Sequence, residues 1–271
     1  MVQYDPLQTL PNEEDLPETD NLPVDNELQI LIPSLLRVIL ALHWAERTDW
    51  LLAINLGLYY DPKKPAIGPD GFLSLGVERF RPGGQLRLSY LVWQEKNIVP
   101  QWVLEIVSKT PGDEYGGKMK QYAKMGVLYY TIYNPDHYKR DKHDPFEVYR
   151  LVNRAYVRQF GNPVWLPEIG LGIGCQQSIY QGLAREWLYW YDHQGNRLLA
   201  PDSIIQQERQ RAIQAEQRAV QEQQRAEQER QRAEQEEQRA IQAQQQAEQE
   251  RRLREELIAR LRERGIDLDD L

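Results

Sequence analysis

The sequence predicts an α+β domain that is followed by a long helix. First, apolar residues recur at helical spacing between Leu28 and Leu42. Second, several short segments rich in β-branched and aromatic residues follow, and a helix-length segment that stops at Gly126 lies among them. Third, residues 202–264 contain neither glycine nor proline and repeat every seven residues, which is typical of a very long helix. The order of helix, strands, helix and strand is that of an α+β fold.

Composition changes sharply near residue 201. Tryptophan, tyrosine, glycine and proline are nearly confined to the residues before it, whereas glutamine, glutamate, arginine and alanine dominate after it. We therefore expect an acidic, proline-containing arm over residues 1–24, a globular domain over residues 25–200, and a long helical or coiled-coil tail over residues 201–271. A globular domain of this size is large enough to bury a sizeable core.

The net charge of −8 is distributed unevenly along the chain. Residues 1–27 contain eight acidic and no basic residues, and residues 201–271 contain 17 acidic and 13 basic ones. Residues 28–200 contain 20 basic and 16 acidic residues, so the globular domain is mildly basic. Several of its basic residues gather between Lys118 and Lys142, which fits a nucleic-acid partner and equally fits a solvated face.

Cysteine usage and hydropathy bear on the cellular compartment. The single cysteine, Cys175, excludes an intramolecular disulfide and a cysteine-based zinc site. The acidic N-terminus has neither the basic region nor the apolar core of a secretory signal. The longest apolar run, Leu35 to Leu42, is interrupted by Arg37 and is too short to span a membrane. We expect a cytoplasmic protein without a membrane segment.

The first element is a core-facing helix, for which we expect Asp25 to be the N-cap. Pro33 lies within its pattern, and Glu27 near its start favours the helix dipole. The apolar positions are Leu28, Leu31, Ile32, Leu35, Leu36, Ile39 and Leu42.

Strand signals follow in series, and a hairpin turned at Asn153-Arg154 lies near their end. The aromatic residues of the last strand could stack nucleic-acid bases or pack a sheet edge. The Gly170–Gly174 segment lacks the ending and spacing of a nucleotide-binding loop, so we discount it. The expected strands are Trp50–Tyr60, Ala66–Val77, Leu86–Trp93, Trp102–Val107, Val127–Tyr133, Phe146–Val152, Ala155–Phe160 and Trp187–Tyr191.

Glu105 is the exceptional residue of these strands, because it lies within the apolar run Trp102–Val107. Burying a carboxylate costs several kcal/mol unless the group is paired or binds a metal. An ion pair with Lys118 or Lys120 on the following helix would compensate it. A second acid, Asp70, ends another apolar approach, so the two acids and a lysine could instead form a site for a hard cation.

Several short motifs follow one another along the domain. They are Pro69-Asp70, Glu105-Ile106-Val107-Ser108, Asp113, Lys118, Tyr122-Ala123, Gly126-Val127 and Tyr129-Tyr130. Their order resembles the Uma-two family of restriction-endonuclease-like proteins, which is abundant in cyanobacteria and belongs to the PD-(D/E)XK nuclease superfamily. The resemblance covers residues 25 to 190. It implies a nuclease-like core with a mixed sheet flanked by helices, here of a type with a C-terminal coiled-coil tail.

The resemblance also implies an activity, which is Mg²⁺- or Mn²⁺-dependent hydrolysis of DNA phosphodiester bonds. Asp70 and Glu105 would hold the cation, and the backbone carbonyl of Ile106 would complete its coordination. The superfamily's usual lysine position is Val107 here, so the lysine role passes to Lys118 on the next helix.

Two accessory assignments and one departure accompany the resemblance. Some superfamily members use a further carboxylate near the start of the first helix, which would be Glu27. Lys120 is the fallback for the catalytic lysine, although residues two apart on a helix point in different directions. Where the family commonly has Ser-Pro-Ser-Thr, this chain has Ser108-Lys109-Thr110.

The rival interpretation is a catalytically inactive nuclease-like scaffold that recruits partners through its tail. An RNA substrate is a third alternative, which no RNA-binding motif supports. The tail itself could be a solvated spacer, or it could mediate a homo-oligomer or bind a protein partner. Its alanine repeat ends in an apolar stripe before Gly265, at Leu253, Leu257, Ile258 and Leu261.

Overall fold

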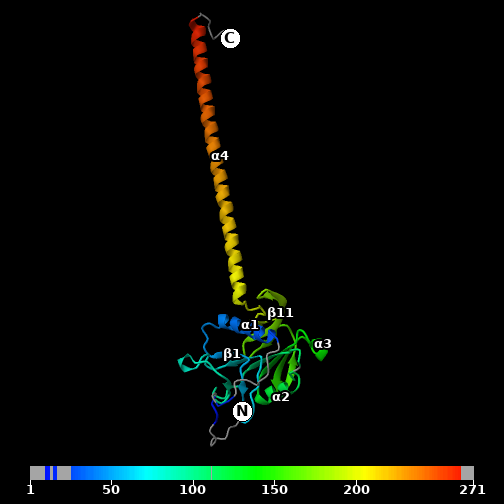
Figure 1. Ribbon diagram of the computed structural model, residues 1–271. Helices are drawn as coiled ribbons and strands as arrows, with labels where there is room; N and C mark the ends of the chain where they lie inside the picture. Colours follow the sequence, from blue (N-terminus) through cyan, green and yellow to red (C-terminus); the bar gives the residue numbers. More distant parts are fainter. Residues whose placement is uncertain (1–9, 13–14, 17–25, 111, 264–271) are drawn as a thin grey trace. The chain divides into compact units, whose positions relative to one another are not determined.

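A computed structural model describes residues 10–12, 15–16, 26–110 and 112–263 (Figure 1). Their contacts divide them into two compact units, and the division falls after Ile204. The first unit contains three sheets and the helices around them, and the second unit is helical. The predicted α+β class is confirmed.

Helix α1 (Leu28–His43) has the apolar face that the sequence predicts, and it begins after Glu27. The expected N-cap, Asp25, lies outside the described residues. The side chain of Asn26 instead accepts a hydrogen bond from the Leu28 N–H at 2.9 Å. Pro33 is buried within the helix, and a Cβ added at Gly71 would meet its Cβ at 3.1 Å, so the glycine lets α1 approach the sheet closely.

The main sheet has six strands in the order β1-β3-β5-β6-β7-β8. Within this sheet, the described pairs are antiparallel except β5 with β6, which are parallel and connected through α2 (Gly117–Met125). Gly126 ends α2 in the left-handed conformation, as a C-terminal glycine does. The six strands are β1 (Trp50–Ile54), β3 (Gly71–Leu75), β5 (Trp102–Ile106), β6 (Tyr129–Tyr133), β7 (Phe146–Val152) and β8 (Ala155–Gln159).

The two faces of the main sheet pack against different helices. Along β5, Trp102, Leu104 and Ile106 belong to the core that α1 covers. Val103 and Val107 belong to the core that α2 covers, on the other face (Figure 1). Because side chains alternate along a strand, Glu105 faces α2 with these valines.

Smaller elements complete the first unit. Strands β2 (Leu58–Tyr59) and β4 (Tyr90–Leu91) form a parallel pair. Strands β9 (Val164–Leu166), β10 (Leu171–Tyr180) and β11 (Leu183–Tyr191) form an antiparallel sheet whose buried residues share one core with α1. The aromatic residues at the end of β11 are buried, so they pack the domain and do not offer a base-stacking surface. A short 3₁₀ segment, η2 (Pro82–Gly84), and helix α3 (Tyr138–Asp141) lie in connections.

Several strand predictions were too long, each for a local reason. The run Trp50–Tyr60 breaks at Asn55, whose φ of 48° interrupts the extended backbone. The run Ala66–Val77 becomes a strand only at Gly71, after Pro69, which cannot donate to a ladder. The run Leu86–Trp93 shrinks to β4, because its first residues form an exposed loop.

Strand β10 was missed, and its glycines explain why. Gly172 and Gly174 weaken a strand signal in the sequence. In the fold, a Cβ at Gly174 would lie 2.8 Å from the Cα of Pro163, so only glycine fits there. The predicted hairpin is confirmed, since Asn153 and Arg154 adopt φ values of 49° and 68° in the turn between β7 and β8.

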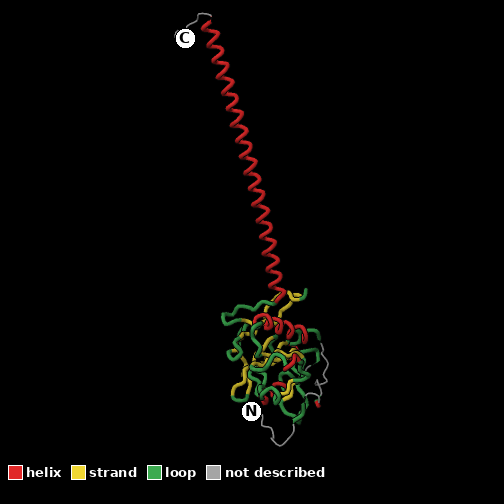
Figure 2. Tube along the Cα trace, turned by 90° about the vertical axis from the view of Figure 1, so that its left-hand side faces the viewer, coloured by secondary structure: helices red, strands yellow, loops and turns green. Residues whose placement is uncertain are grey.

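Helix α4 (Pro201–Glu263) is the long helix that the sequence predicts, and it is uninterrupted along its length (Figure 2). Its described side chains are exposed or half-exposed, and ion pairs four residues apart link several of them. Arg264 and the expected stop at Gly265 lie outside the described residues. Coiled-coil pairing stays a prediction. No helix in the described part of the chain is both long and apolar enough to cross a membrane.

Candidate active site

The pairing of β3 with β5 brings the two predicted acids together. Gly71 lies opposite Leu104 in this antiparallel ladder. The next positions outward are Asp70 and Glu105, which therefore lie side by side on the α2 face of the sheet. Two acids that are 35 positions apart in sequence thus meet where β3 begins and β5 ends.

Asp70 is held by the backbone of the neighbouring strand. Its Oδ2 accepts a hydrogen bond from the Ile106 N–H at 2.6 Å, and the residue is 6% exposed. Within the described part of the chain, its other oxygen, Oδ1, accepts no hydrogen bond. One oxygen fixes the carboxylate, and the other remains available to a ligand.

Glu105 is held by α2. Its Oε2 accepts a hydrogen bond from Lys118 Nζ at 2.9 Å, and its Oε1 accepts one from the Tyr122 hydroxyl at 2.6 Å. Lys118 and Tyr122 are four residues apart, so they project from the same face of the helix. The predicted Glu105–Lys118 ion pair is present, and Glu105 is only 1% exposed.

Burial and mutual repulsion shift the pKa values of these groups. Burial, followed by the charge of Glu105, raises the pKa of Asp70 well above its ordinary value. Burial also raises the pKa of Glu105, although Lys118 and Tyr122 oppose that shift. Burial by itself lowers the pKa of Lys118, but the Glu105, Asp70 and Glu114 carboxylates raise it above its ordinary value. Excess negative charge at this position therefore favours a bound cation.

Glu114 is a third buried acid beside this site, and the sequence analysis missed it. Its carboxylate accepts the Gly112 N–H at 3.0 Å, and its negative charge acts on Asp70, Glu105 and Lys118. The hydroxyl of Tyr130 donates to its backbone carbonyl at 2.9 Å. A Gly-Asp-Glu sequence after a proline is typical of an exposed loop, so burial of this acid had no sequence signal.

The structure does not bring the two accessory residues into the site. Lys120 is exposed, and in the described part of the chain it makes no ion pair with Glu105. Glu27 precedes α1 and lines a separate pocket of about 300 Å³ with Lys109 and Arg185. The geometry favours Lys118 as the site lysine and leaves Glu27 as a residue of the α1 start.

The residues present fit a hard divalent cation with some of its ligands supplied by water. Asp70 and Glu105 are oxygen donors, and the backbone of Ile106 lies against Asp70. Among the described residues, no group of three His, Cys, Asp or Glu side chains is arranged to hold a metal. A two-carboxylate set suits Mg²⁺, which usually keeps several waters and binds one or two protein carboxylates.

Comparison with known proteins adds a family to this geometry. A family model, Uma2, described as "Putative restriction endonuclease", matches residues 15–180. The match spans the main sheet and α2, and the mixed sheet flanked by helices is consistent with a restriction-endonuclease-like fold. No curated protein matches the chain significantly.

Proposed function

The chain belongs to the Uma2 family, and on this premise we propose that it is a metal-dependent endonuclease that hydrolyses DNA phosphodiester bonds. One observation carries the proposal. Two buried carboxylates from adjacent strands, Asp70 and Glu105, lie together with Lys118 in direct contact with one of them. A chain with a single cysteine fits the cytoplasmic setting that we propose for it.

In this proposal Asp70 and Glu105 hold Mg²⁺ or Mn²⁺, and the carbonyl of Ile106 contributes a further oxygen. When bound, such a cation supplies charge stabilisation at the phosphate and lowers the pKa of a coordinated water. The Ile106 N–H and the Tyr122 hydroxyl orient the two carboxylates, as partners of metal ligands commonly do.

Lys118 supplies the positive charge of the chain itself. Its ammonium group stays protonated, because three carboxylates raise its pKa despite burial. It donates to Glu105 and has further N–H groups to offer a phosphate oxygen or the attacking water. Such a fixed donor in a half-buried position stabilises negative charge that develops at the phosphate more effectively than solvent does.

One observation favours the second candidate, an inactive scaffold that recruits partners through its tail. Both oxygens of Glu105 already have partners in Lys118 and Tyr122, so a structural ion-pair network would also account for this acid. It does not account for the unbonded oxygen of Asp70 beside it. We therefore place the nuclease first.

Calorimetric titration of the full chain with Mn²⁺ separates the two candidates. We expect binding by the wild type, and loss of it in Asp70→Ala and Glu105→Gln. Glu46→Gln, which changes an exposed acid after α1, is the matched control and should bind as the wild type does. Absence of binding by a folded wild-type protein would leave the scaffold as the better candidate.

A further inference from the structure

A groove of about 190 Å³ lies beside the edge strand β1. Residues 51–54 of β1 line it. It is also lined by Arg37 from α1 and by Arg79, Phe80, Leu86 and Arg87 from the loop that follows β3. No acidic residue is among those that line it. We call it the arginine groove.

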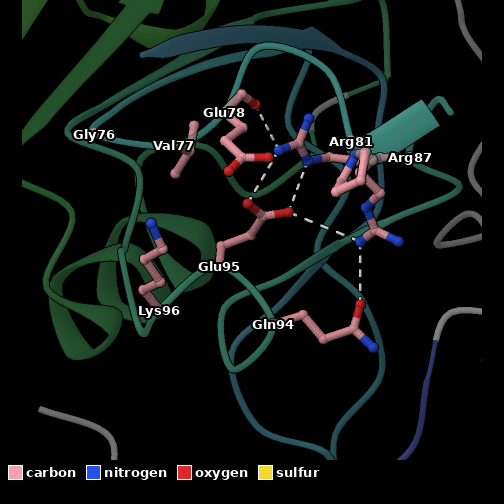
Figure 3. A pocket seen from close by; sticks show the side chains of 9 residues that line it. Gly76, Val77, Glu78, Arg81, Arg87, Gln94, Glu95 and Lys96 are labelled. Atoms are coloured by element: carbon pink, nitrogen blue, oxygen red, sulfur yellow. Dashed lines mark hydrogen bonds and ion pairs between the residues drawn. The ribbon is translucent and has the colours of Figure 1, made fainter. Parts of the chain in front are cut away.

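Arg87 holds the loop after β3 in place through hydrogen bonds. Its Nε and Nη2 donate to the Glu95 carboxylate at 2.7 and 3.0 Å, and Nη2 also donates to the Glu78 carbonyl at 2.7 Å (Figure 3). Arg81 donates to Gln94 at 3.1 Å. The Arg87 side chain is 5% exposed, so this clasp neutralises its charge and fixes the loop that presents Arg79.

Arg37 and Arg79 lack such a counter-charge. In the part of the chain that the structure describes, neither residue makes an ion pair with a carboxylate. Arg79 stacks over the ring of Trp50 at 4.4 Å, which holds its guanidinium in one position. Burial first, and then the charges of Arg37 and Arg87, lower its pKa. Trp50 thus positions Arg79, and the charge of Arg37 acts on it from nearby, so an anion would be stabilised at this place.

The groove also presents apolar surface next to these cations. Phe80 is 54% exposed and Leu86 is 75% exposed, and both lie on the loop that the clasp fixes. A ligand that offers phosphates together with sugar and base surface satisfies both features. A free inorganic anion would leave the apolar surface uncovered.

The arginine groove lies on the strand that leads to the candidate active site. The Asn55 N–H, directly after β1, donates to the backbone carbonyl of Asp70 at 3.3 Å. From Asn55 back to Leu51 the strand covers about 13 Å, since a strand rises about 3.3 Å per residue. Along one DNA strand this corresponds to about four phosphates at 3.4 Å per step.

We propose that the arginine groove binds the backbone of duplex DNA a few base pairs from the phosphate that is cut. This inference rests on the proposed nuclease function, and it assigns Arg37 and Arg79 to substrate binding and not to chemistry. The contacts are electrostatic and therefore independent of base sequence.

The test is fluorescence anisotropy of a labelled 20-base-pair duplex with the full-length protein in EDTA, so that binding is measured without cleavage. Arg37→Gln/Arg79→Gln should weaken binding at least tenfold. It should also make the negative slope of log K against log salt concentration shallower by about two, which is about one for each lost phosphate contact. Arg37→Lys/Arg79→Lys keeps both charges and should retain most of the affinity. Arg154→Gln, which removes an exposed charge elsewhere in the same unit, should leave the slope unchanged.

A second substrate keeps this inference separate from the proposed function. Hydrolysis of bis(p-nitrophenyl) phosphate with Mn²⁺ needs the acids and Lys118 but not the arginine groove, so the double glutamine variant should hydrolyse it at the wild-type rate. DNA binding that is indifferent to both arginines overturns the inference while leaving the nuclease in place. A shift from dimer to monomer on the same substitutions, with DNA affinity unchanged, would show instead that the groove joins two copies of the chain.

Discussion

Lys118 is the side chain whose role differs most between a nuclease and a structural ion pair. An ammonium group does not ligate a metal, but it stabilises charge on a reacting phosphate. Lys118→Ala should therefore lower the cleavage rate by about 100- to 1,000-fold. Mn²⁺ binding should be nearly intact, because the cation itself compensates Glu105. Single-turnover cleavage and calorimetry of the same sample measure the two effects.

Lys120→Ala is the matched control on the same helix. Its side chain is exposed, so we expect wild-type cleavage. A fully active Lys118→Ala together with an inactive Lys120→Ala would transfer the catalytic assignment to Lys120.

Asp70 makes the stability of the metal-free protein depend on pH. Its pKa is raised on folding, so the folded state holds this proton more tightly than the unfolded chain does. Stability is then greatest below the ordinary carboxyl pKa, and it falls as the pH rises toward the raised one. Asp70→Asn removes this loss, and at about pH 8 it should stabilise the metal-free protein by about 0.5–2 kcal/mol.

Chemical denaturation in EDTA over a range of pH measures this difference. The advantage of Asp70→Asn should vanish below about pH 3, where the carboxyl group is largely protonated in both states. Asp136→Asn, at an exposed acid, should show no such trend. A variant less stable than the wild type at every pH would mean that Asp70 is not strained by its neighbours.

Among single residues, two members of the candidate site could be predicted from local sequence patterns. Glu105 interrupts an apolar strand, and Lys118 shares a helix face with Tyr122, so both could be inferred from spacing. Glu114 could not, because its burial depends on how the loop before α2 folds back over Tyr130. Which oxygen of Asp70 stays unbonded also depends on the strand register, which only the fold reveals.

At the element scale, α4 can be separated from the rest of the chain. The described residues divide into compact units after Ile204, and the buried side chains lie before that position. Deleting residues 205–271 should leave a folded first unit with an unchanged affinity for Mn²⁺. Circular dichroism melting and calorimetry of the truncated chain measure this, and loss of cooperative melting would contradict it.

Self-association of the tail should depend on its leucines. Alanine seams bury little area, and buried apolar surface contributes only about 25 cal/mol per Å². Leu253 and Leu257 are the large side chains exposed near the end of the helix. Changing Leu257 and Leu261 to glutamine should therefore weaken any oligomer more than changing Ala226 and Ala233 does. Sedimentation velocity compares the two double variants, and an oligomer indifferent to the leucines would refute this assignment.

Element prediction succeeded where local signals were strong and failed where tertiary contacts decided. The Asn153-Arg154 turn and the stop of α2 at Gly126 were predicted, because both need backbone conformations that few residues adopt. Strand β10 was missed, since its glycines are required by the close approach of Pro163 and not by local preference. Strand β4 was predicted too long, because Leu86 and Leu88 before it lie in an exposed loop.

Across the whole molecule, the net charge hides a difference in charge between the globular domain and the regions on either side of it. The acidic residues 1–27 and the acidic tail make the chain negative, while the domain between them is mildly basic. The α+β class followed from element order. The parallel pairing of β5 and β6, which places α2 over Glu105, could not be predicted from element order and is known only from the sheet topology.

In the proposed function, Asp70, Glu105 and a divalent cation together cut DNA. Incubating supercoiled plasmid with the full-length protein, in Mn²⁺ and separately in EDTA, tests it most directly when Glu105→Gln is assayed beside the wild type. We predict nicked or linear plasmid with the wild type in Mn²⁺, none in EDTA, and a rate at least about 100-fold lower for Glu105→Gln. Equal cleavage in EDTA, or by Glu105→Gln in Mn²⁺, would contradict the account.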